Sequence, residues 1–158
     1  MMIHIQLATQ RLTFIQQQQT LLSTPVSTAL NGPGEQAGSG CTPCGKLVVK
    51  AKIGTGAPLG SVFVGRRATG EIYTAALGKA QPQRDWILTR ILWLGGLEPG
   101  KNRYGKVDTL RRYIYIHGCP PEYPMGQALS HGCIRMRDKA LVQLFDLVDT
   151  GTVVWITD

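Results

Sequence analysis

The sequence has few acidic residues, few aromatic side chains and no long apolar run. Of its 158 residues, 10 are Asp or Glu, 17 are Lys or Arg, and 7% are aromatic. No stretch approaches the ~20 apolar residues of a transmembrane helix, so no membrane association is expected. The N-terminus alternates polar and apolar residues and lacks the basic and apolar regions of a secretory signal. We therefore expect a cytoplasmic protein with reduced cysteines, or a periplasmic one if a leader has been removed.

Because acidic residues are few, the chain has a formal charge of +7 and a pI near 9.5. This positive charge favours an anionic partner or substrate. Seven basic residues lie between Lys101 and Arg137. They lack the interleaved aromatic residues of a groove that binds single-stranded nucleic acid, and nucleic acid is not an expected partner. A solvated basic face and a binding region for a carboxylate-bearing substrate both remain open.

Composition and periodicity predict one mostly β domain over residues 1–158. Hydrophobic residues make up 43% of the chain, and 19 glycines and nine prolines indicate many turns. Apolar residues recur at helical spacing after Arg137, with Asp138 at the helix start and Gly151 at its end. We expect about eight strands and one main helix. Nine segments are strand candidates, over 3–7, 11–16, 21–29, 46–53, 61–65, 71–75, 86–94, 113–116 and 153–156.

Cys41 and Cys44 form a C-x-x-C pair in the most loop-like stretch of the chain, residues 31–45. A structural zinc site needs four ligands, and the chain has no second C-x-x-C. A thioredoxin-like redox pair precedes a helix, which the pattern does not predict here. Incidental thiols in a turn are the third alternative, and the sequence favours them.

The side chains best suited to catalysis or metal binding are concentrated between His117 and Cys133. These seventeen positions hold two of the three histidines and two of the four cysteines. A nearby imidazole lowers the pKa of a thiol from about 8.5 to roughly 3.5–7.5. Cys133 and His117 could therefore form a Cys-His acyl-transfer pair if the loop between them doubles back. Gly132 would let backbone amides approach and stabilise a tetrahedral oxyanion.

Two other interpretations compete with this one. His117, Cys119, His131 and Cys133 form two H-x-C patterns, and four such ligands could hold zinc in a structural domain. Structural zinc ligands usually follow C-x-x-C or H-x-x-x-H spacing, which these residues do not. The remaining alternative is a set of buried histidines and small apolar thiols without a chemical role.

Two segments of the chain resemble a known signature. Residues 130–135, Ser-His-Gly-Cys-Ile-Arg, preceded by Ile-His-Gly at 116–118, are similar to the motif of the L,D-transpeptidase (YkuD) family of peptidoglycan enzymes. The Thr-Pro-x-Gly turn at 42–45, the opening hairpin and the helix after the motif also fit. The resemblance covers essentially the whole chain and implies a mostly β sandwich, with neither a cofactor nor a metal expected.

The resemblance also implies a role for each motif residue. Cys133 would be the nucleophile and His117 the general base, with the Gly118 carbonyl orienting the imidazole. The amides of Gly132 and Cys133 would form the oxyanion hole. Ser130, His131 and Arg135 would shape the site. These implied roles require the motif residues to meet in one cleft.

Substrate contacts are expected from two further residues. Arg135 would bind a substrate carboxylate, and Tyr104 lies in a glycine-rich loop, residues 95–108, that could fold over the site. Cys119 departs from the family pattern, because a threonine or another small polar residue is expected there. Under oxidation it could cross-link to Cys133 and silence the enzyme.

The substrate implied by the resemblance is the peptidoglycan tetrapeptide stem or a muropeptide. The enzyme would cut between meso-diaminopimelate and the terminal D-alanine through a Cys133 acyl-enzyme. Carbapenem-type inhibitors would also acylate Cys133. Transfer to an amine is transpeptidation, whereas transfer to water makes a cytoplasmic L,D-carboxypeptidase of muropeptide recycling. The motif residues do not separate these two outcomes.

Overall fold

The computed structural model describes residues 1–158. It contains an α-helix α1 (Ala75–Ala80), a 3-10 turn η1 (Gly105–Val107) and the main helix α2 (Asp138–Leu147). The strands are β1 (Met2–Gln6), β2 (Arg11–Gln16), β3 (Gln19–Pro25), β4 (Gly45–Ile53), β5 (Ser61–Val64), β6 (Arg67–Ile72), β7 (Ile87–Gly96), β8 (Tyr115–Gly118), β9 (Ile134–Met136) and β10 (Val153–Thr157). None of the helices combines the length and apolarity needed to cross a membrane.

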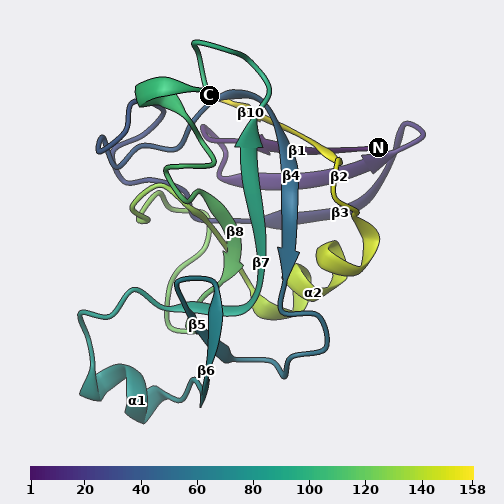
Figure 1. The fold of residues 1–158 in the computed structure, drawn as a ribbon. Helices are drawn as coiled ribbons and strands as arrows, with labels where there is room; N and C mark the ends of the chain where they lie inside the picture. Colours follow the sequence, from purple (N-terminus) through teal and green to yellow (C-terminus); the bar gives the residue numbers. More distant parts are fainter.

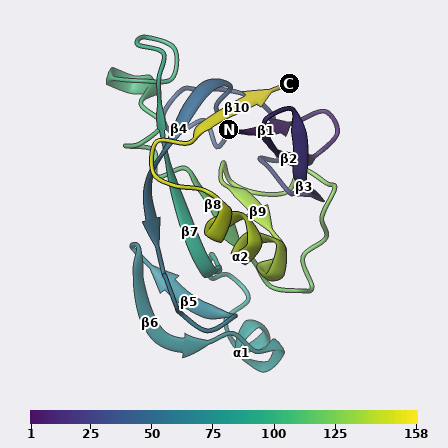
Figure 2. The ribbon, with the colours of Figure 1, turned by 90° about the vertical axis from the view of Figure 1, so that its right-hand side faces the viewer.

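All strands belong to one hydrogen-bonded sheet, which curls around the core (Figure 1). Its main path runs β3-β2-β1-β10-β4-β7-β5-β6, while β8 pairs with β7 and β9 pairs with β8. The long strand β7 joins these parts, since it pairs with β4 over 91–96, with β8 over 88–93 and with β5 at its start. Figure 2 shows β5, β6 and α1 extending from one end of the main body. Strand β7 therefore links this extension to β8, the strand that carries His117.

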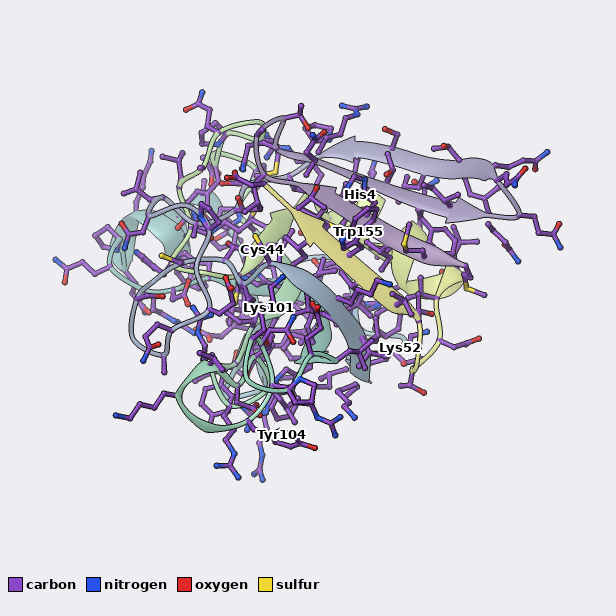
Figure 3. The ribbon with its side chains drawn as sticks, turned by 90° about the horizontal axis from the view of Figure 1, so that it is seen from above. His4, Cys44, Lys52, Lys101, Tyr104 and Trp155 are labelled. Carbon is purple, nitrogen blue, oxygen red and sulfur yellow. The ribbon has the colours of Figure 1, made fainter.

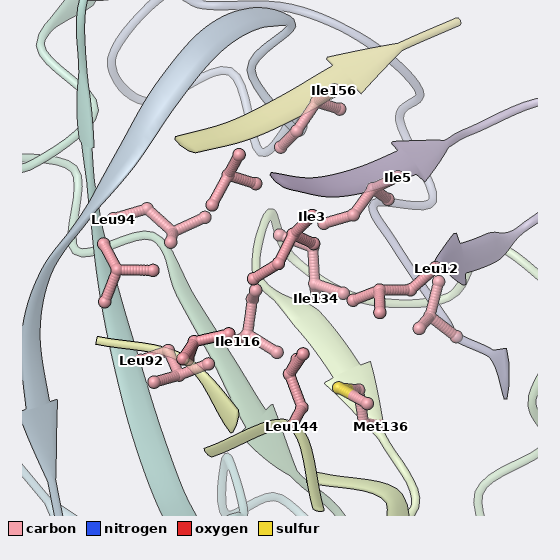
Figure 4. Packing of buried hydrophobic residues seen from close by; sticks show 14 of the residues in the cluster. Ile3, Ile5, Leu12, Leu92, Leu94, Ile116, Ile134, Met136, Leu144 and Ile156 are labelled. Atoms are coloured by element: carbon pink, nitrogen blue, oxygen red, sulfur yellow. The ribbon is translucent and has the colours of Figure 1, made fainter. Parts of the chain in front are cut away.

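The core lies between the curled sheet and α2. Twenty buried hydrophobic residues form it, with Ile3 and Ile5 from β1, Ile116 from β8 and Ile156 from β10 among them (Figure 4). Alternating residues of β1 and β2 point into it, because successive side chains of a strand face opposite sides. Helix α2 contributes its apolar stripe, including Leu144. This packing holds β8 and β9 side by side against the helix.

The mostly β prediction with one main helix after the motif is confirmed. The opening hairpin forms as expected, with β1 antiparallel to β2. Pro25 ends β3, which lies at the edge of the sheet, where a residue without an amide hydrogen is tolerated. The sandwich expected from the resemblance takes the form of one continuous curled sheet.

Several element boundaries differ from the prediction. Tyr113 does not begin the β8 strand, because its φ of 57° turns the chain just before it. Helix α2 ends at Leu147, four residues before Gly151. The predicted second strand of the 61–75 hairpin begins at Arg67 and ends at Ile72. Helix α1 and the short strand β9 were not predicted, since each is too short to carry a clear periodic pattern.

Candidate active site

Strands β8 and β9 bring the two halves of the motif together. They pair in parallel, with His117 opposite Arg135 and Ile116 opposite Ile134. Cys133 directly precedes β9 and lies beside Tyr115 of β8. Its sulfur accepts a hydrogen bond from the Tyr115 amide at 3.3 Å, and its thiol donates to the Tyr113 carbonyl at 3.4 Å. The loop between the two motif halves therefore doubles back, as the acyl-transfer interpretation requires.

The His117 imidazole is buried and held by its own strand. Its Nδ1 lies 2.7 Å from the carbonyl oxygen of Gly118. A carbonyl oxygen can only accept a hydrogen bond, so Nδ1 carries the ring proton of the neutral imidazole and Nε2 does not. Nε2 has no protein hydrogen-bond partner in the structure. The tautomer is thus the one in which Nε2 can take up a proton.

His117 and Cys133 open onto the same cavity, which has a volume of about 470 Å³. Of the residues expected at the site, Ser130, His131 and Arg135 also line it. The cavity is mixed in character, since apolar side chains alternate with charged ones. The other lining residues are Gly65, Arg66, Asp85, Ile87, Arg112, Tyr113, Ile114 and Tyr115.

The thiol and the imidazole are both neutral in the free protein, which differs from the expected thiolate. Burial raises the pKa of the Cys133 thiol to about 12, against smaller lowering effects of the Tyr115 amide, Arg135 and Arg112. Burial also lowers the pKa of His117 below its usual 6.5, although the Gly118 hydrogen bond opposes this. No hydrogen bond joins the imidazole to the sulfur, whose partners are both backbone groups. The free protein therefore holds no preformed thiolate–imidazolium pair.

Ser130 shapes the turn that carries the sulfur. Its Oγ donates to the Cys133 carbonyl at 2.6 Å and accepts from the Gly132 amide at 3.2 Å. The Gly132 amide is therefore already engaged, contrary to its expected place in the oxyanion hole. The Cys133 amide has no hydrogen-bond partner, so it remains available to an oxyanion.

Thr42 supports the same turn from the other side. Its hydroxyl donates to the Gly132 carbonyl at 2.9 Å and accepts from the Ala29 amide at 3.0 Å. Gly132 has a φ of +134°, and a Cβ there would lie 3.2 Å from the Cys41 carbonyl oxygen. Glycine is thus required both by the backbone angle and by the close approach of the 41–42 segment.

Arg135 lies buried on the cavity wall without an acidic partner. Its guanidinium stacks over the Tyr123 ring at 4.9 Å and makes one long hydrogen bond, 3.5 Å to the Leu129 carbonyl. The two salt bridges of the structure, Arg84–Glu71 and Lys101–Glu98, lie elsewhere. Arg135 is therefore a cation on the cavity wall without an ion-pair partner. His131 is exposed on the rim of the cavity.

Three charged residues at the cavity were not found by the sequence argument. Arg112 donates to the Cys41 carbonyl at 2.6 Å. Arg66 reaches from the β5–β6 turn to the Tyr115 hydroxyl at 3.0 Å. Asp85 is the only acidic residue lining the cavity. Arg66 and Asp85 reach the site from segments distant in sequence, so no local motif marks them. Arg112 directly precedes the 113–118 stretch and was noted only as one of the seven basic residues between Lys101 and Arg137.

Tyr104 does not reach the site. It lines a separate cavity of about 280 Å³ together with Lys50, Arg103, Asp108 and Arg111, and Figure 3 shows it pointing outward. The 95–108 loop folds back on the β4–β7 end of the sheet instead of over His117. Asn102 holds it there, donating to the carbonyls of Cys44 and Lys46 at 3.0 and 3.1 Å.

The remaining thiols lie apart from Cys133. Cys119 is buried and donates to the Met136 carbonyl at 3.5 Å. The register separates it from Cys133 by four strand residues, or about 13 Å, whereas a disulfide needs Cα atoms within ~7 Å. The proposed cross-link therefore does not fit. Cys41 and Cys44 are free thiols, and the ligands of the zinc alternative do not converge into a metal-binding group.

Comparisons with solved structures identify the fold. An L,D-transpeptidase from Mycobacterium smegmatis matches 99% of this chain with a TM-score of 0.63 at 16% identity. A mutant Enterococcus faecium L,D-transpeptidase matches 98% with a TM-score of 0.59 at 15% identity, and LdtMt1 in complex with imipenem matches 99% with a TM-score of 0.58 at 16% identity. The molecule thus has the curled β fold of L,D-transpeptidases.

The family follows from the sequence itself. The model of the YkuD L,D-transpeptidase catalytic domain matches residues 1–156, and the chain belongs to this family. The Bacillus subtilis (strain 168) protein YqjB, provisionally named an L,D-transpeptidase, is 46% identical over 47 residues, which are 30% of this chain and 27% of that protein. The chain spans 58%, 48% and 58% of the three structures, so it corresponds to only part of each.

Proposed function

We propose that this chain is a cysteine acyltransferase that cleaves the meso-diaminopimelate–D-alanine bond of peptidoglycan tetrapeptide stems. Membership of the L,D-transpeptidase family supports the reaction class. The observation that carries the proposal is the 2.7 Å contact from His117 Nδ1 to the Gly118 carbonyl. It leaves Nε2 unprotonated inside the cavity that the Cys133 thiol also lines.

Acylation starts from the neutral pair. The sulfur of Cys133 attacks the scissile carbonyl carbon while its proton passes to Nε2 of His117, and the carbonyl oxygen becomes an oxyanion. The free amide of Cys133 donates to this oxyanion, and such a donor is worth about 3–4 kcal/mol in the transition state. The intermediate then collapses, the C–N bond breaks, and D-alanine leaves with the proton from His117. A thioester remains on Cys133.

Deacylation reverses the proton path. His117 takes a proton from an amine or a water molecule as that group attacks the thioester, and the thiol leaves as it regains the proton. An amine yields a cross-linked or exchanged stem, and water yields a tripeptide. Asp85 lies on the cavity wall, and its charge favours the approach of an ammonium-bearing acceptor. We therefore favour transpeptidation over the carboxypeptidase reaction.

A defined disaccharide tetrapeptide, incubated with and without a D-amino acid acceptor and followed by mass spectrometry, tests this proposal. Wild-type protein should release D-alanine and form the exchanged product. Cys133→Ala should abolish release, and His117→Gln should lower its rate by about 100-fold or more. Unimpaired turnover by Cys133→Ala would eliminate the mechanism, and tripeptide as the sole product would establish the carboxypeptidase instead.

Covalent inhibitors give a second test of the nucleophile. Solved structures with this fold include LdtMt1 with imipenem and an L,D-transpeptidase of Mycobacterium tuberculosis with a faropenem-derived adduct. We expect a carbapenem to acylate Cys133 of this chain, adding its mass to the intact protein. The Cys133→Ala variant, which retains the other three thiols, is the matched control. A mass increase in that variant would assign the adduct to another residue.

A further inference from the structure

The carbonyl that holds the imidazole belongs to the Gly118–Cys119 peptide, and Asp138 packs against that peptide. Helix α2 begins with Asp138 and lies beside β8 and β9 (Figure 2). A Cβ on Gly118 would collide with Oδ1 of Asp138 and would lie 2.7 Å from the Leu88 carbonyl oxygen. The carboxylate therefore sits directly behind the glycine whose carbonyl contacts His117, in space that only glycine leaves open.

The Asp138 side chain is half-buried, and one of its two carboxylate oxygens is turned into the protein. Its Oδ1 is inaccessible to solvent and makes no hydrogen bond within normal range, and the residue forms no salt bridge. Burial raises its pKa, whereas the Cys119 amide and the Thr89 hydroxyl face the carboxylate and favour its charged form.

The neighbouring residue Thr89 is strained. It is fully buried and has a φ of 75°, in the left-handed region that β-branched residues avoid. The strain coincides with the register shift of the β7–β8 pairing between Leu88 and Ile91. Its hydroxyl accepts from the Gly60 amide at 3.0 Å. Such a conformation is unfavourable and often occurs at functional sites.

We propose that Asp138 is a positioning residue for His117, acting through the Gly118–Cys119 peptide. The amide and the carbonyl of a trans peptide point in opposite directions. The Cys119 amide lies on the side of this peptide where the Asp138 carboxylate packs, and the Gly118 carbonyl lies 2.7 Å from Nδ1 of His117. The sequence of groups is carboxylate, amide, carbonyl and imidazole. In a Ser-His-Asp triad the carboxylate contacts the imidazole directly, whereas here one peptide group lies between them.

The negative charge of Asp138, as well as its position, strengthens the contact between the Gly118 carbonyl and His117. A carboxylate facing the amide polarises the peptide and makes its carbonyl a stronger acceptor. The Nδ1–H tautomer is thereby favoured, and so is the imidazolium formed when Nε2 takes the thiol proton. No proton moves along the peptide, and Asp138 contacts neither the substrate nor the sulfur. This inference rests on the proposed function only for its kinetic consequence.

Asp138→Asn removes the charge at nearly constant size, and Asp146→Asn, on the exposed side of the same helix, is the matched control. We expect Asp138→Asn to lower kcat for tetrapeptide cleavage about tenfold, by analogy with outer partners of other functional histidines, and to leave KM unchanged. The ¹⁵N shifts of the His117 ring should show a smaller Nδ1–H population. A merely structural role would instead lower the melting temperature and leave the tautomer of the folded protein unchanged.

The outcomes separate this inference from the proposed function. An unchanged kcat and unchanged ¹⁵N shifts in Asp138→Asn would overturn the inference while leaving the acyltransferase intact. A wild-type protein inactive on the tetrapeptide would overturn the function, yet the ¹⁵N shifts would still decide the role of Asp138. If Asp138→Asn does not fold, the wild-type shifts decide, because a predominant Nε2–H tautomer there contradicts the proposed geometry.

Discussion

At the scale of residues, the proposed chemistry starts from a thiol and an imidazole that are both neutral before substrate binds. Enclosure of the Cys133 sulfur outweighs the lowering effects of the Tyr115 amide and two arginines on its pKa. The same enclosure keeps His117 unprotonated at pH values where an exposed histidine would carry charge. The pair therefore resembles a serine–histidine pair, in which the proton leaves as the nucleophile attacks, more than a preformed thiolate–imidazolium pair.

This neutral pair predicts the acid limb of the pH profile. The pKa of His117 is lowered from 6.5, so the midpoint of the acid limb should lie below that ordinary value. We expect kcat/KM for the tetrapeptide to be more than half of its plateau value at pH 6.5 and to decline at lower pH. A pH–rate profile measures this directly, and a decline already complete above pH 6.5 would show that the base is not buried as described.

Asp85 carries a second prediction at this scale. Because it is the only acid in the cavity lining, Asp85→Asn should lower the ratio of amine transfer to hydrolysis. The effect should be about threefold, since an exposed charge contributes at most about 1 kcal/mol. Product ratios by mass spectrometry check this, with the exposed Asp149→Asn as the control. Equal ratios in the two variants would remove Asp85 from acceptor binding.

At the scale of elements, the site consists of short segments that are held in place by contacts with one another. Strands β8 and β9 are only four and three residues long, and neither would be stable alone. Helix α2 packs against β8 from one side, while the 41–42 turn contacts the 130–133 turn from the other. Precise placement of the sulfur therefore depends on segments that lie 90 residues apart in the sequence.

Substitution of Thr42 tests the contact between the 41–42 turn and the 130–133 turn. Thr42→Val keeps the shape but leaves the buried Ala29 amide and the Gly132 carbonyl without their partner. Loss of such bonds costs about 1–3 kcal/mol. We expect that loss in urea unfolding, together with slower carbapenem acylation of Cys133. The exposed Thr20→Val on β3 is the control, and an equal, negligible effect of both changes would contradict the bracing role.

At the scale of the whole molecule, the sheet joins the two ends of the chain. Strand β10 lies between β1 and β4, parallel to the first and antiparallel to the second. Its inward residues Val154 and Ile156 are fully buried in the main core. The segment that follows α2 thus completes the wall against which β8 and β9 pack.

The contribution of β10 to the stability of the protein can be measured with two substitutions of Ile156 that remove progressively more of the side chain. Ile156→Val should cost about 0.5–1.5 kcal/mol of unfolding free energy and Ile156→Ala about 2–5 kcal/mol, because the cavity grows with each methyl group removed. Urea denaturation of both variants provides the test. Equal losses in the two variants would mean that the site collapses around the smaller side chain.

Much of this protein is determined locally and can be predicted from the sequence. Period-two alternation marks β1 and β2, apolar runs mark β4 and β10, and helical spacing marks α2, because each pattern reflects which side chains face the core. The two-part motif around His117 and Cys133 identified the family and located the candidate chemistry before any coordinates. Local patterns were insufficient for β9 and α1, which are too short, and for Tyr113, whose backbone turns where its type favours a strand.

Other features were decided only by the tertiary structure. The protonated state of Cys133, the engagement of the Gly132 amide by Ser130, the position of Tyr104 away from the cavity and the carboxylate of Asp138 behind Gly118 all follow from the folded chain. Each depends on burial or on a specific contact in three dimensions. Burial shifts a pKa and a contact occupies a donor only once the chain has folded, and for that reason residue types and spacings alone did not reveal them.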